Sequence, residues 1–160
     1  MDVSKLKRIN NKLHLNFFRE RVPTRNGYGE ELVKLGKRNK NIMVLCADLA
    51  ESTRVHHFRK KYPKRYVEMG VAEQNLVTVA AGLAAVGKIP FASSYAAFCP
   101  GRCWEQIRTT ICYNDQNVKI IGAHAGISVG PDGATHQALE DLAVMRSLPN
   151  MVVIVPADYE

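Results

Sequence analysis

The sequence predicts an α/β fold, a doubly wound and mainly parallel sheet with helices on both faces. Segments with the apolar spacing of helices alternate with short, continuous apolar runs, which are typical of strands covered on both sides. The 160 residues are enough for one domain with its own core. With 46% hydrophobic and 23% charged residues, the composition is that of a globular protein.

The first half of the chain is expected to contain two helices and two strands. Residues 27–37 predict a helix because apolar side chains recur there at roughly helical spacing. Residues 42–47 (IMVLCA) are a continuous apolar run and predict a buried strand, while residues 66–68 are a shorter strand candidate. Residues 73–86, rich in alanine and glycine, predict a closely packed helix that Gly87 ends.

The second half continues the same alternation. We expect a strand over residues 90–94, a helix over 102–112 and a buried strand over 118–123. A short helix over 139–146 and a final strand over 151–155 follow. Such alternation predicts a parallel sheet with helices on both faces. Because another helix normally follows such a strand, we expect the polypeptide to be a fragment or one subunit of a larger assembly.

The excess positive charge lies at the start of the chain. The net charge is +7, and residues 1–40 contain eleven Lys or Arg against four Asp or Glu. We therefore separate a basic N-terminal arm, residues 1–21, from a domain over residues 22–160. A basic arm can bind nucleic acid or a membrane, but we favour a solvated face or a surface for an acidic partner. The cation- and aromatic-rich residues 58–66 are interpreted as a helix end and a proline turn.

Several functional classes are disfavoured by composition. No apolar run approaches the roughly 18 residues of a membrane span, and the N-terminus has no apolar signal core. We expect a cytoplasmic protein with neither membrane nor nucleic acid as partner. The four cysteines lack CxxC spacing, so we expect reduced thiols and no metal ligands in this chain.

Polar and aromatic side chains gather just after the predicted strands. They are Asp48, Tyr95, Phe98, His124 and Asp132. Ligands of parallel sheets bind beyond the carboxyl ends of the strands, so one rim should collect these residues. Tyr95 and Phe98 could equally pack in the core. His124, Asp132 and His136 share a glycine-rich loop between two apolar runs, where polar side chains are free to face a ligand.

Glu73 is a single acid at the start of a helix of small residues. It could simply favour the helix dipole, or it could act on a ligand. Burial would raise the pKa of such a carboxyl, and the dipole would oppose that shift.

Four motifs occur in order, GVAEQN, SSYAAFCPGR, GPDGATHQ and EDLAVMRSLPN. They resemble the pyrimidine-binding domain of transketolases, which are thiamine diphosphate enzymes. The resemblance covers residues 22–160. It implies transfer of a two-carbon ketol unit between sugar phosphates in the pentose phosphate pathway. A related thiamine-dependent transferase, such as a deoxyxylulose-phosphate synthase-like enzyme, and a catalytically silent assembly module remain alternatives.

The resemblance also implies roles at the cofactor. Glu73 would hydrogen-bond a ring nitrogen of the aminopyrimidine and so activate the cofactor. Phe98 would stack on that ring, Tyr95 would line the same pocket, and Asp48 would lie near the cofactor and the dimer contact.

Roles at the substrate follow in the same way. His124 and His136 would contact the substrate and take part in catalysis, and Asp132 would recognise its hydroxyls. Arg25 and Ser52 would grip the sugar phosphate, since a planar guanidinium binds phosphate at two points. Arg102 is a further candidate phosphate contact.

The chain departs from the family pattern in three respects. Pro131 replaces an acid that pairs two active sites across a dimer, and the family's GDG…Asn magnesium–diphosphate motif and C-terminal domain are not found. The resemblance thus implies that a diphosphate-binding transketolase subunit holds Mg²⁺ and the diphosphate of thiamine diphosphate. We expect a homodimer or heterotetramer, and no activity without that partner.

Overall fold

A parallel sheet of four strands forms the centre of the molecule in the computed structural model, which describes residues 22–159. The strands are β1 (Ile42–Cys46), β2 (Tyr66–Glu68), β3 (Ile89–Tyr95) and β4 (Lys119–Ala123). Their order is β2-β1-β3-β4, and every neighbouring pair is parallel. The predicted sheet type is confirmed. The basic arm over residues 1–21 lies outside the described residues.

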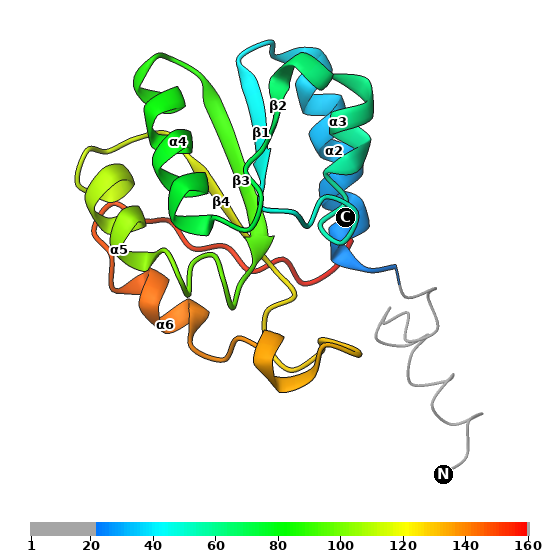
Figure 1. The fold of residues 1–160 in the computed structure, drawn as a ribbon, viewed down its shortest axis with the longest axis vertical. Coiled ribbons are helices and arrows are strands. Elements are labelled where there is room, and N and C mark those ends of the chain that lie inside the picture. Colours follow the sequence, from blue (N-terminus) through cyan, green and yellow to red (C-terminus); the bar gives the residue numbers. More distant parts are fainter. Residues whose placement is uncertain (1–21, 160) are drawn as a thin grey trace, which may run out of the picture.

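Helices cover both faces of this sheet, as the sequence predicts. Figure 1 shows α2 (Thr24–Arg38) and α3 (His56–Lys61) on one side and α4 (Glu73–Ala85) on the other. On the α4 side, α5 (Trp104–Gln106) continues into the wider π-helical turn η2 (Ile107–Cys112). The remaining elements are η1 (Pro63–Arg65), η3 (Gly133–His136) and α6 (Asp141–Arg146).

The core has two halves because successive side chains of β1 point to opposite faces. Val44 packs with Leu32 and Phe58 beneath α2 and α3. Leu45 packs with Leu76 beneath α4. Each of these side chains is at most 1% exposed, so β1 is covered on both sides, as its unbroken apolar sequence indicates.

Arg65, in the turn after α3, packs against the protein itself. The Arg65 guanidinium lies 4.2 Å from the Tyr62 ring centroid and donates a 2.7 Å hydrogen bond to the Gly36 carbonyl. A helix ending at Lys61 and a turn beginning at Pro63 lead into β2. The structural interpretation of residues 58–66 is therefore confirmed.

The final strand predicted over residues 151–155 is wrong. The segment pairs with no strand among the described residues. Met151 and Val153 pack against the core, whereas Val152 and Ile154 are 80% and 81% exposed. The period-two alternation of a strand is present, but a strand also needs a neighbouring edge for its backbone hydrogen bonds, and composition alone does not supply one.

Two further findings bear on the composition-based expectations. No helix within residues 22–159 is long and apolar enough to cross a membrane. All four cysteines are buried, and none of them forms a disulfide.

Candidate functional site

The candidate site lies at the carboxyl ends of β1, β3 and β4. The chain passes from β1 outward to β2 and then crosses back to β3 on the other side of β1. The winding direction therefore reverses between β1 and β3, which is where open parallel sheets bind ligands. Tyr95 is the last residue of β3, and His124 directly follows β4.

Four rings meet at this edge. The Tyr95 ring lies 4.1 Å from that of His124 and 6.2 Å, in stacked orientation, from that of Phe98, all between centroids. His136 meets Phe98 edge-on at 5.2 Å and Tyr95 at 6.1 Å. We call Tyr95, Phe98, His124 and His136 the ring cluster. Tyr95 is 6% exposed and Phe98 half-buried, so the cluster is rooted in the core but reaches the surface.

The glycine-rich loop folds back on itself and so brings the two histidines together. Gly126 and Ala138 exchange backbone hydrogen bonds of 2.7 and 3.3 Å. The turn η3 then ends at His136, facing Phe98. Asp132, exposed in the same loop, is near enough for its charge to act on His124. Asp132 therefore acts on His124 through its charge, and no side-chain hydrogen bond within residues 22–159 joins the two.

Arg25, from the start of α2, fixes the state of His124. Its Nη1 donates to His124 Nε2 at 2.8 Å and to the Ser52 carbonyl at 3.4 Å. Because a guanidinium only donates, Nε2 must accept, which leaves the proton of the neutral ring on Nδ1. His124 Nδ1 and Arg25 Nε are both buried and have no hydrogen-bond partner within residues 22–159. Both N–H donors therefore lack an acceptor within the described residues.

The same surroundings favour the neutral form of His124. Burial lowers the pKa of its imidazole and the nearby Arg25 charge lowers it further, while Asp132 acts in the opposite direction. The backbone of His124 has a φ of 56°, a left-handed conformation that is uncommon for residues with a side chain and frequent at functional sites.

Glu73 lies at the first position of α4 and is 2% exposed. Its Oε2 accepts a 2.9 Å ion pair from Arg102 Nη1, and the Arg102 guanidinium lies 4.7 Å from the Phe98 ring centroid. Glu73, Arg102 and Gln106 line an open cavity of about 460 Å³. A continuous series of contacts therefore joins Ser52, Arg25, the ring cluster, Arg102 and Glu73.

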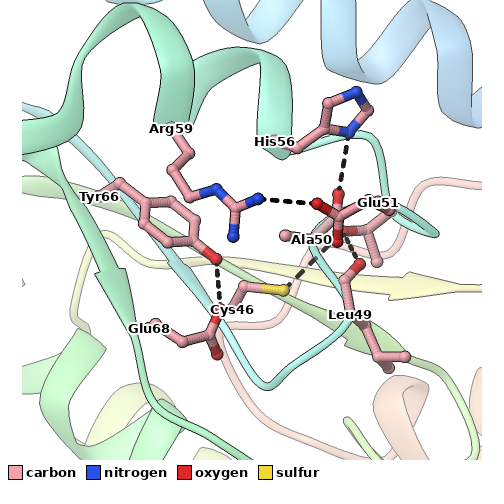
Figure 2. A network of polar contacts seen from close by, with 9 residues as sticks. Cys46, Leu49, Ala50, Glu51, His56, Arg59, Tyr66 and Glu68 are labelled. Carbon is pink, nitrogen blue, oxygen red and sulfur yellow. Dashed lines mark hydrogen bonds and ion pairs between the residues drawn. The ribbon is translucent and has the colours of Figure 1, made fainter.

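Asp48 is held at the end of β1 by Glu68. The Glu68 carboxylate accepts the backbone N–H groups of Asp48 (2.8 Å) and Gly70 (3.1 Å) and the Tyr66 hydroxyl (2.5 Å). Figure 2 shows Tyr66 and Glu68 beside the loop that follows β1, which is further tied by a 2.7 Å ion pair between Arg59 and Glu51. Glu68 therefore joins the Asp48 loop to the segment that leads into α4.

The structure brings together most of the residues singled out in the sequence. Eight of them lie in the continuous set of contacts: Arg25, Ser52, Glu73, Tyr95, Phe98, Arg102, His124 and His136. Ser52 joins it through its carbonyl. No hydrogen bond or ring contact in the described part of the chain joins Asp48 to the ring cluster.

Sequence reasoning missed two features of the site. The first is the set of hydrogen bonds that Glu68 accepts from the Asp48 loop and its surroundings. Its only sign in the sequence is an acid shortly before the glycine-containing turn that leads into α4. The pairing of Arg102 with Glu73 spans 29 positions, and no local pattern predicts it. Within residues 22–159, no group of three or more His, Cys, Asp or Glu is arranged to hold a metal ion.

Comparison with known proteins adds an independent line of evidence. Residues 20–160 match the transketolase pyrimidine-binding domain family. A Methanocaldococcus jannaschii protein described as a transketolase C-terminal section is 56% identical over 135 residues, covering 84% of this chain and 43% of that protein. Human transketolase is 40% identical over 140 residues, covering 87% of this chain and 22% of that protein.

A solved structure gives the same result for the fold. A split-gene transketolase, described as an inactive β4 tetramer, matches with a TM-score of 0.76 and 56% identity. The match covers 88% of this chain and 45% of that one. This chain therefore spans less than half the length of each of these three proteins.

Proposed function

Because this chain belongs to the transketolase pyrimidine-binding domain family, we propose that it supplies the pyrimidine-binding half of a thiamine diphosphate site. The proposed reaction transfers a two-carbon ketol unit between sugar phosphates, in the cytoplasm and as part of pentose phosphate metabolism. One observation carries the proposal. Glu73 is a nearly inaccessible carboxylate in the wall of a cavity, linked through Arg102 to the face of Phe98.

The residues present fit the aminopyrimidine part of thiamine diphosphate. The Glu73 carboxylate can share a hydrogen bond with a ring nitrogen, and its burial strengthens that bond. The face of Phe98 accepts a planar group, since the Arg102 guanidinium already lies over it. When bound, the cofactor supplies the carbon nucleophile that attacks a ketose carbonyl.

The substrate end of the proposed site is rich in donors. Arg25 Nε and His124 Nδ1 are the two buried donors without a partner in the described chain. A guanidinium suits a phosphate, and a neutral imidazole can donate to a carbonyl or hydroxyl oxygen. We propose that Arg25 and Ser52 hold the sugar phosphate, that His124 and His136 orient the reacting oxygens, and that Asp132 accepts from the sugar hydroxyls.

A second chain completes the proposed site. We propose that a diphosphate-binding transketolase subunit holds the cofactor's diphosphate and Mg²⁺, in a homodimer or heterotetramer, with Asp48 near the contact. The names of two similar proteins support this arrangement, one a transketolase C-terminal section and the other a split-gene transketolase. The first name describes one section of a transketolase, and the second describes a transketolase encoded by a split gene.

Replacing Glu73 by glutamine tests the catalytic role. In the complex with a diphosphate-binding subunit, Glu73→Gln should lower ketol transfer by about 100-fold or more, because proton sharing of this kind contributes that much to rate. Co-elution with the partner should be unchanged. Glu140→Gln, which alters an exposed acid outside the cavity that Glu73 lines, is the matched control. Full activity of Glu73→Gln would refute the proposal, and intact assembly without activity in the wild type would indicate a silent assembly module.

A further inference from the structure

Arg102 covers both groups that the proposed site offers to an aminopyrimidine. Its Nη1 lies 2.9 Å from Glu73 Oε2, and its guanidinium carbon lies 4.7 Å from the centre of the Phe98 ring. A planar ring stacked on the face of Phe98 that Arg102 covers, and bonded to Glu73 Oε2, would need the same space and the same carboxylate oxygen. The two arrangements exclude one another, so Arg102 must leave before such a ring can bind.

Burial shows which partner is able to move. The Glu73 side chain is 2% exposed, whereas that of Arg102 is 49% exposed. The backbone N–H of Arg102 donates to the Phe98 carbonyl at 2.8 Å, so its main chain is held while its long side chain reaches solvent. Arg102 therefore closes the site from outside and can open it by side-chain rotation alone.

The ion pair has a clear physical reason in the empty site. A buried carboxylate without a counter-charge is strongly unfavourable. Arg102 supplies that charge and stacks on an aromatic face at the same time. Both interactions favour the closed arrangement when nothing is bound.

A second position for the guanidinium is available in the same cavity. Gln106 lines the cavity with Arg102 and Glu73, and its Oε1 is buried without a hydrogen-bond partner in the described chain. Its Nε2 is already used by Glu105 at 2.8 Å. A buried acceptor without a donor is costly, so Gln106 Oε1 is well suited to receive Arg102 after it leaves Glu73.

We propose that Arg102 is an autoinhibitory latch, paired with Glu73 in the empty site and transferred to Gln106 when an aminopyrimidine binds. The proposal rests on the proposed function, since it assumes that Glu73 and Phe98 bind that ring. The latch lowers apparent affinity in proportion to the population of the closed state. It also occupies Glu73 Oε2 until the cofactor binds.

The test is to titrate 4-amino-2,5-dimethylpyrimidine into the full chain and measure its Kd by ligand-observed NMR at pH 8. Arg102→Met should bind about tenfold more tightly than the wild type, since a charged hydrogen bond no longer has to be broken. Gln106→Leu should bind more weakly, because the open position is lost. Arg108→Met is the matched control, as Arg108 stacks on Trp104 at 5.0 Å and has no ion pair within residues 22–159.

The outcomes separate the latch from the site that it guards. Equal Kd values for wild type and Arg102→Met would overturn the latch and leave the aminopyrimidine site intact. Absence of binding by every variant would overturn the proposed function and the latch with it. Arg102→Met combined with Glu73→Gln should lose the gain in affinity. Near-UV circular dichroism checks folding, and Arg102→Gln, which keeps an amide donor but no charge, replaces Arg102→Met if the latter does not fold.

Discussion

The energy that couples Glu73 to Arg102 can be measured without any ligand. The structure pairs a carboxylate that is 2% exposed with a guanidinium that is 49% exposed, at 2.9 Å. Arg102→Met removes the counter-charge and leaves Glu73 buried and unpaired. Glu73→Gln removes the charge but keeps a side chain that can still accept a hydrogen bond from Arg102.

The expected magnitude follows from these exposures. Breaking a fully buried pair costs about 3–5 kcal/mol. Because water reaches half of the Arg102 side chain, we expect Arg102→Met to lower the free energy of unfolding by about 2 kcal/mol. Glu73→Gln should cost about 1 kcal/mol. The double variant should be at least about 1 kcal/mol more stable than the sum of the single losses predicts, since the methionine no longer leaves a charge unpaired.

Urea unfolding of the full chain at pH 7.5 gives all four free energies. The linear dependence on urea should keep the same slope in each variant, as expected when only stability changes. If the stability lost in the double variant equals the sum of the two single losses to within about 0.5 kcal/mol, the two side chains are not coupled. That result would refute both the ion pair and the argument that the empty site needs a counter-charge.

Three further predictions concern the framework of the site. Glu68→Ala should lower stability by about 1–2 kcal/mol, because two backbone N–H groups lose their acceptor, and Glu68→Gln should recover part of that loss in urea unfolding. The pKa of His124 is lowered in the folded chain, so its contribution to stability is present above the unfolded pKa near 6.5 and is lost as pH falls. The stability of the wild type relative to His124→Gln should therefore decrease between pH 7.5 and 5.5, and a constant difference would contradict the assignment. Gly36→Ala should destabilise by about 1–3 kcal/mol despite its better helix propensity, because a Cβ there would lie 2.5 Å from the Phe58 ring, and an unchanged midpoint in a thermal scan would contradict that packing.

The spacing of apolar residues predicts the sheet, because buried positions of strands and helices carry apolar side chains. The unbroken apolar run of β1 and the small residues of α4 both reflect packing on two sides. The rim residues were predictable for a related reason, since strand ends in a parallel sheet share one edge. Arg25, His124 and Tyr95 meet there although 99 positions separate the first two.

Which strand edges and side chains pair with one another is harder to predict from the sequence than which residues are buried. The segment over residues 151–155 has the alternation of a strand, yet whether it joins a sheet depends on a free neighbouring edge. The tautomer of His124 and the partner of Glu73 depend on one guanidinium each. A long flexible side chain can reach many positions, so only the folded chain shows which acceptor it takes.

Ketol transfer from xylulose 5-phosphate to ribose 5-phosphate, with thiamine diphosphate and Mg²⁺, is the decisive assay of the proposed half-site. The full chain should be assayed alone and then mixed with a diphosphate-binding transketolase subunit. We expect activity in the mixture and none from either chain alone, because each chain would hold one half of the cofactor site. Activity from this chain alone would contradict the half-site, and an inactive but stably assembled mixture would contradict the proposed reaction.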